Sequence, residues 1–159
     1  MDSFLISEIP VPTASGPGSL RVGHARMDDE HDDFLGLVQA LLSAPDTELI
    51  ASLDQLIAHA SAHFAQEDTW MCELEFPARK CHMDEHAAVL RSANGVRRRT
   101  AAGDLHSARL FARELDSWFA PHVQHLDSAL ATWICKSNFD ARPFVFHPPM
   151  RARPISAGA

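Results

Sequence analysis

An all-α fold, an antiparallel up-and-down bundle of four helices, is predicted from three features of the sequence. Apolar residues recur at alternating steps of three and four positions along four long segments, which is the period of an amphipathic helix. Glycine is scarce, with 7 residues among 159, and tyrosine, which favours strands, is absent. The segments are joined by short connections, and short connections make neighbouring helices antiparallel.

The first helix is predicted over residues 27–43, after an irregular arm that spans residues 1–26. Prolines and glycines scattered through the arm predict little regular structure there. The stripe of residues that predicts the helix comprises Met27, His31, Phe34, Val38 and Leu41. Pro45 ends the segment, and Asp46 is a good N-cap for the next helix.

The second and third helices are predicted over residues 46–75 and 78–101. The stripe of the second helix comprises Leu49, Leu53, Leu56, Ala60, His63, Glu67, Trp70 and Leu74. The stripe of the third helix comprises His82, His86, Val89, Ala93 and Val96. Pro77 separates the two helices. Gly103 then breaks the pattern, and Asp104 is placed to cap the helix that follows.

The fourth helix is predicted over residues 105–136, so the bundle spans residues 27–136. Its stripe comprises Ala108, Ala112, Leu115, Phe119, His122, Leu126, Ala129 and Trp133. Pro121 lies within this helix, where proline removes a backbone hydrogen bond and clashes with a preceding carbonyl group, so a kink is expected beside His122. The remaining residues, 137–159, are rich in proline and are predicted to form an extended tail.

Charge and composition exclude several classes of function. A formal net charge of -7 argues against nucleic-acid binding, which requires a basic face. No run approaches the roughly 18 apolar residues of a membrane span, and residues 1–10 lack the basic-then-apolar order of a secretion signal. We therefore expect a soluble, cytoplasmic protein with no membrane partner. The three cysteines lack CxxC spacing and are interpreted as free thiols.

Six polar side chains occupy stripe positions that face the predicted apolar core. They are His31, His63, Glu67, His82, His86 and His122. A buried polar group without a partner costs about 1–3 kcal/mol, so six of them would cancel much of a typical total stability of about 5–15 kcal/mol. A partner inside the bundle must therefore satisfy these groups.

The local spacing indicates that this partner is a metal. Residues four apart lie on the same face of a helix, so His63 and Glu67 point to one place, as do His82 and His86. Imidazole nitrogen combined with carboxylate oxygen suits iron, zinc, copper or nickel, whereas calcium and magnesium prefer shells of oxygen. More donors converge than a single tetrahedral zinc ion accepts.

Four motifs follow one another between about residues 20 and 135. They are Val22-Gly23 through Met27-Asp28-Asp29-Glu30-His31, then His63-Phe64 with Glu67 and Met71, then His82 to His86, and finally Trp118 with His122 and Asp127. Together these motifs resemble the hemerythrin family, and in particular its bacterial single-domain members. A lone HxxxH motif is a weak signal, whereas four motifs in the right order are a strong one.

The resemblance implies a non-haem centre of two iron ions that binds dioxygen reversibly, for storage, delivery or sensing. It divides the ligands between the ions: His82, His86 and His122 on one, His31 and His63 on the other, and Glu67 and Asp127 bridging both. Asp127 is selected by the resemblance alone, because five residues correspond to about 140° around an α-helix. The aromatic neighbours Phe64, Phe119 and Trp118 are interpreted either as core packing or as walls of a dioxygen pocket.

Two functions of other classes stay open. The first is a di-iron enzyme that turns over peroxide or nitric oxide. Such an enzyme usually needs a proton donor at the site, and the sequence commits no acid to that place, so we expect a protein that is not an enzyme. The second is a signalling or interaction module that the metal stabilises, and its protein partner is unknown.

Overall fold

The computed structural model describes residues 20–140 of the chain, and this range is helical, with no strand. Its elements, in chain order, are α1 (Ala25–Ser43), the 3-10 turn η1 (Asp46–Glu48), α2 (Leu49–Glu73), α3 (Arg79–Ala101), α4 (Leu105–His122), the π-helical turn η2 (Val123–Asp127) and α5 (Ser128–Asp140). The predicted all-α class is confirmed. No helix within this range is long and apolar enough to cross a membrane.

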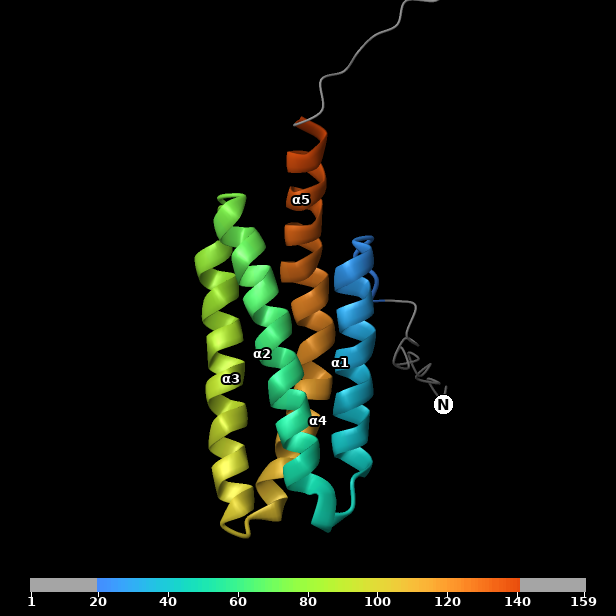
Figure 1. Cartoon of the computed structure of the whole chain (residues 1–159), viewed down its shortest axis with the longest axis vertical. Coiled ribbons are helices and arrows are strands. Elements are labelled where there is room, and N and C mark those ends of the chain that lie inside the picture. Colours follow the sequence, from blue (N-terminus) through green and yellow to red (C-terminus); the bar gives the residue numbers. More distant parts are fainter. Residues whose placement is uncertain (1–19, 141–159) are drawn as a thin grey trace, which may run out of the picture.

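The helices pack as four rods that run alternately up and down (Figure 1). α4, η2 and α5 follow one another in a single rod, and the α4 part of this rod packs against both α1 and α3. α2 packs against α1 and α3 in turn, which closes the bundle. The antiparallel four-helix bundle predicted from the sequence is therefore confirmed.

Two apolar clusters fill the bundle, one on each side of a polar layer. The larger cluster is built around large buried side chains such as Phe34, Leu53, Phe64, Leu115 and Phe119. The smaller cluster contains Met27, Met71, Phe76, Leu130, Ala131 and Ile134. On α1 the polar layer consists of His31, which lies one turn from Met27 in the smaller cluster and one turn from Phe34 in the larger one. The polar layer is thus shielded from water at both ends.

The helix ends follow local capping. α1 begins at Ala25, two residues earlier than predicted, because the backbone N–H of Met27 donates to Nδ1 of His24 at 3.3 Å. The predicted cap Asp104 is in place, since its Oδ1 accepts from the backbone N–H of Ser107 at 3.1 Å. The predicted start of the second helix at residue 46 opens a 3-10 turn instead, and α2 begins only after that turn.

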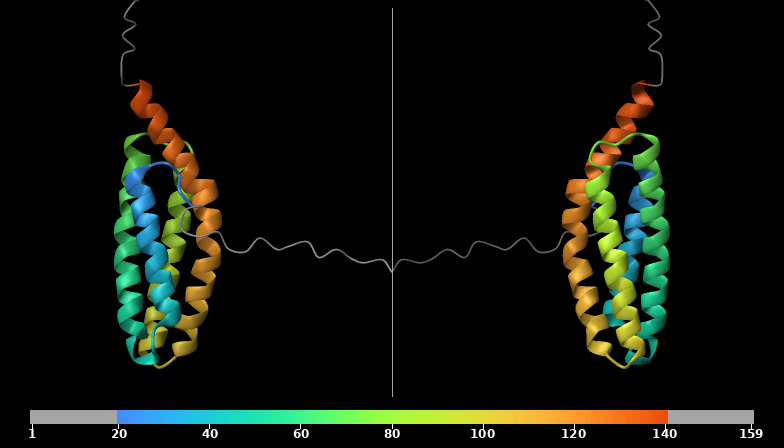
Figure 2. Two further views of the ribbon diagram at one scale, coloured as in Figure 1. Left: turned by 90° about the vertical axis from the view of Figure 1, so that its right-hand side faces the viewer. Right: turned by 90° about the vertical axis from the view of Figure 1, so that its left-hand side faces the viewer.

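The predicted fourth helix is not one uniform α-helix. The chain stays α-helical through Pro121, so the expected kink does not interrupt α4. The irregularity follows directly afterwards, where the backbone N–H of Ser128 donates to the carbonyl of Val123, five residues back, in a π turn. α5 then leans away from the axis of α4 (Figure 2).

The helical region extends farther than the sequence pattern indicated. α5 continues to Asp140, so the first residues of the segment 137–159, which was predicted to be extended, are helical. The rest of that segment, from residue 141, lies outside the described residues, as do residues 1–19 of the predicted arm.

Candidate metal centre

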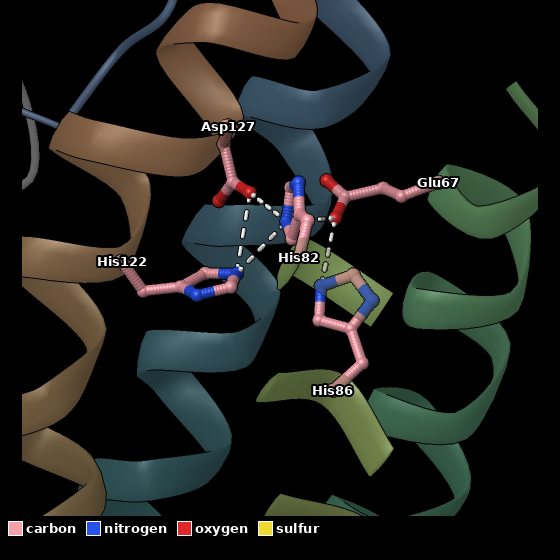
Figure 3. Close-up of side chains that lie close together, drawn as sticks. All are labelled: Glu67, His82, His86, His122 and Asp127. Atoms are coloured by element: carbon pink, nitrogen blue, oxygen red, sulfur yellow. Dashed lines mark hydrogen bonds and ion pairs between the residues drawn. The ribbon is translucent and has the colours of Figure 1, made fainter. Parts of the chain in front are cut away.

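The seven side chains predicted to bind metal are buried together in the polar layer. Each residue is at most 3% exposed, and they come from all four rods: His31 on α1, His63 and Glu67 on α2, His82 and His86 on α3, His122 on α4 and Asp127 on η2. Figure 3 shows five of them pointing toward one another from α2, α3, α4 and η2. Seven potential metal donors therefore meet inside the bundle.

The π turn brings Asp127 to the site. In an α-helix, five residues would turn Asp127 about 140° away from His122. A π turn closes its hydrogen bond over five residues instead of four, so positions i and i+5 come to the same side. As a result, Nε2 of His122 and Oδ1 of Asp127 lie 3.3 Å apart.

The five histidines form two groups. His31 and His63 meet edge to face with ring centroids 5.4 Å apart, and we call them the two-histidine half. His82, His86 and His122 form the three-histidine half, in which the shortest distance between ring centroids is 4.5 Å and the longest is 5.2 Å. Each half is built from residues on two helices.

Glu67 presents one carboxylate oxygen to each half. Its Oε1 lies 3.6 Å from Nε2 of His63, in the two-histidine half. Its Oε2 lies 3.3 Å from Nε2 of His86 and 3.6 Å from Nε2 of His82, in the three-histidine half. A carboxylate oriented in this way is placed to bridge two cations.

Asp127 is divided between the halves in the same manner. Its Oδ2 lies 3.1 Å from Nε2 of His31. Its Oδ1 faces the three-histidine half, 3.0 Å from Nε2 of His82 and close to His122. With three ring nitrogens and two carboxylate oxygens, the three-histidine half offers five inward donors, whereas the two-histidine half offers four.

Nine buried nitrogen and oxygen atoms of this layer have no hydrogen-bond partner among the described residues. They belong to His31, His63, Glu67, His82, His86 and Asp127. Several nitrogen–oxygen pairs are close, but their geometry does not make hydrogen bonds. Each such group costs about 1–3 kcal/mol, so the layer is unfavourable without a further partner. Cations that accept both imidazole and carboxylate donors fit this arrangement.

Burial shifts the protonation of the layer. It lowers the pKa of His63 to about 3 and the pKa of His86 to about 2, so both rings are neutral at pH 7 and offer a lone pair. Burial, together with the charge of Asp127, raises the pKa of Glu67 well above its usual range. Burial acts in the same direction on Asp127, but close contacts with three histidines outweigh it and hold the pKa of Asp127 well below its usual range.

The metal-free protein is expected to lose stability in mild acid. Between pH 6.5 and 4.5, His63 and His86 stay neutral in the folded chain but take up protons in the unfolded chain, because their folded pKa values are depressed. Glu67 has the opposite sign, since its raised pKa lets the folded chain keep a proton that the unfolded chain releases. The two histidines with depressed pKa values outweigh this carboxyl group, so the unfolded chain binds more protons than the folded chain over this range, and the free energy of unfolding falls as pH falls.

Thermal unfolding of the metal-free protein across this pH range measures the effect. The variant His63→Leu removes one of the two histidines, so its unfolding temperature should depend much less on pH. A native metal-free protein with the same unfolding temperature at pH 6.5 and 4.5 contradicts this account.

Two acidic side chains that were not nominated from the sequence contact the outer ring nitrogens of the three-histidine half. Oδ1 of Asp68 lies 2.9 Å from Nδ1 of His86, and Oε2 of Glu85 lies 3.1 Å from Nδ1 of His122. Each acid contacts a histidine of the neighbouring helix, so its role depends on the register between helices. No spacing within a single helix could have indicated it.

Aromatic rings cover both halves. Phe64 stacks on His86 with centroids 4.0 Å apart, and Trp118 lies 4.3 Å from His122. Phe119 meets His31 edge to face at 5.4 Å. Phe64 and Trp118 therefore lie against the three-histidine half, and Phe119 lies against the two-histidine half. Their role as walls of a dioxygen pocket stays a prediction.

The family model described as "Hemerythrin HHE cation binding domain" matches residues 22–134, a range that contains all seven buried donors. The Bacteriohemerythrin of Ralstonia nicotianae is 38% identical over 132 residues, which cover 83% of this chain and 96% of that protein. No solved structure gives a significant match. On its sequence, its fold and its buried donors, the chain belongs to the hemerythrin family.

Proposed function

We propose that this protein binds dioxygen reversibly at a pair of non-haem iron ions, for storage, delivery or sensing of oxygen. The observation that carries the proposal is the division of two carboxylates, Glu67 and Asp127, between the two histidine groups. Two neighbouring cations need such bridging oxygens, and a single ion does not. Membership of the hemerythrin family and the name of the bacterial relative support the same conclusion.

The distances support one division of the residues between the two ions. His82, His86 and His122 would hold one ion together with Oε2 of Glu67 and Oδ1 of Asp127, and His31 and His63 would hold the other together with Oε1 of Glu67 and Oδ2 of Asp127. When bound, ferrous iron supplies the electrons and the free coordination position that dioxygen requires. The two-histidine half has fewer protein donors, so it offers the space for a small ligand.

The protein also keeps water away from this half. His31 touches the edge of Phe119, which in turn stacks on Phe34 at 4.4 Å, and all three residues are at most 1% exposed. A dry, apolar wall limits the delivery of protons to a bound ligand and so limits irreversible side reactions. These surroundings favour reversible binding over turnover.

The test is the metal content per chain combined with optical spectra under air and after anaerobic reduction. We expect two iron atoms per chain and a spectrum that changes reversibly when oxygen is admitted to and withdrawn from the reduced protein. Immediate oxidation without an oxygenated form would defeat the proposal. Steady-state turnover of peroxide or nitric oxide by the iron-loaded protein would support the enzyme alternative instead.

A further inference from the structure

The two halves of the site differ in what holds the outer side of their imidazoles. In the three-histidine half, Nδ1 of His86 faces the carboxylate of Asp68 at 2.9 Å, and Nδ1 of His122 faces the carboxylate of Glu85 at 3.1 Å. The third histidine of this half, His82, has a buried Nδ1 without a partner in the described part of the chain, so two of its three rings are held from outside. Both contacts join neighbouring helices: Asp68 on α2 reaches α3, and Glu85 on α3 reaches α4.

The two-histidine half lacks such support. Nδ1 of His31 is buried without a hydrogen-bond partner, and over residues 20–138 no carboxylate contacts Nδ1 of His31 or His63. His59, one turn before His63, is turned elsewhere, with its Nε2 3.1 Å from the carbonyl of Glu30. The asymmetry therefore concerns the outer contacts as well as the number of inward donors.

An outer carboxylate acts on a metal-binding histidine in two ways. It accepts the proton on Nδ1, which fixes the tautomer whose Nε2 lone pair points inward, and it orients the ring. Its negative charge also makes the imidazole a stronger donor. The side chains of Asp68 and Glu85 are 32% and 43% exposed, so water solvates both carboxylates while they hold the buried rings.

We propose that Asp68 and Glu85 are positioning residues that orient His86 and His122 through Nδ1, and that the three-histidine half consequently binds its ion first and more tightly than the two-histidine half. This inference rests on the proposed binding of two ions. It adds the order in which the two halves bind iron, and it attributes that order to Asp68 and Glu85, which are not themselves ligands.

The experiment is an anaerobic titration of the metal-free full-length protein with ferrous iron against a competing chelator. The native protein should bind iron in two separable steps. His31→Leu, which alters only the two-histidine half, should abolish the second step and keep the first. Glu85→Leu and Asp68→Leu should each weaken the first step by about 10–100-fold, the range found when outer partners of metal-binding histidines are removed.

Conservative variants separate positioning from simple structural support. Glu85→Gln keeps an oxygen that accepts from Nδ1 of His122 but lacks the charge, so it should recover part of the lost affinity. Glu114→Gln is the matched control, because Glu114 lines the same surface groove as Glu85 and Trp118 but contacts none of the metal-site histidines. Thermal unfolding of metal-free Glu85→Gln should match the native protein, since the amide oxygen still accepts from Nδ1 of His122. Glu85→Leu leaves that buried nitrogen without a partner, so it should unfold at a lower temperature.

The outcomes are distinct. Two equal binding steps in the native protein, or Glu85 and Asp68 variants that leave the first step unchanged or weaken both steps equally, overturn the inference while the proposed function stands. A native protein that binds fewer than two irons per chain at saturation refutes the proposed function itself.

Discussion

Removal of the metal is expected to lower the thermal unfolding temperature of the protein by roughly 15 °C or more. A ligand that binds only the folded chain stabilises it by about 4 kcal/mol when its free concentration is about a thousand times its dissociation constant, so two ions contribute about 8 kcal/mol. For a chain of this length, each kcal/mol shifts the unfolding temperature by about 2–4 °C. Seven of the nine unpartnered atoms of the polar layer, all except Nδ1 of His31 and Nδ1 of His82, give the structural reason, because the two proposed ions would satisfy them.

Calorimetry of the chelator-treated and the iron-reloaded protein measures this difference. The unfolding temperature should rise with the free ferrous iron concentration, as linkage requires. Magnesium serves as the control, since a small hard cation prefers oxygen ligands and should not restore the stability. Identical unfolding temperatures with and without iron would mean that the layer is satisfied in some other way.

The helical stripes predict most of this site because the donors obey the same period as the core. His31 replaces an apolar residue between Met27 and Phe34, and it therefore points inward as they do. The same reasoning holds for His63 and Glu67 on α2, which are buried as the stripe requires. A polar residue at an apolar position is informative because its burial must be compensated.

Asp127 shows where such reasoning ends. On a regular α-helix it falls outside the stripe of His122, and only the resemblance to a family selected it. The π turn points Asp127 toward the site, and no helix propensity predicts such a turn. Pro121 lies just before the turn and lacks a backbone N–H donor, which is the one local signal near this position. Sequence periodicity assumes a constant number of residues per turn, so it cannot anticipate a change of that number.

Asp68 and Glu85 were missed for a different reason. The chain contains 21 acidic residues, most of them suited to a solvated helix face, and nothing within one helix distinguishes these two. Their function depends on which residue of the neighbouring helix lies opposite, and packing fixes that register. Outer contacts of a metal site are therefore visible only once helices are assembled.

The second large effect is expected for Glu67→Leu, which should bind little or no iron and yet fold more stably than the native protein when both are metal-free. Because the Glu67 carboxylate faces His63 on one side and His86 on the other, its loss removes a donor from both halves at once. Iron per chain should therefore fall from two toward none, as measured by elemental analysis after saturation and desalting.

The gain in metal-free stability has the opposite origin. Both oxygens of Glu67 are buried without a hydrogen-bond partner, and burial raises the pKa of this carboxyl well above its usual range, which shows how unfavourable its charge is there. Replacing such a group by an apolar side chain of similar size should stabilise the metal-free fold by about 1–3 kcal/mol.

His31→Leu is the matched comparison, because it alters only the two-histidine half and should leave one iron per chain. If Glu67→Leu retained two irons per chain, or if it retained one as His31→Leu should, Glu67 would not bridge the two halves. If the substitution instead lowers the metal content and raises the metal-free stability, Glu67 is a residue that metal binding requires and that destabilises the metal-free fold.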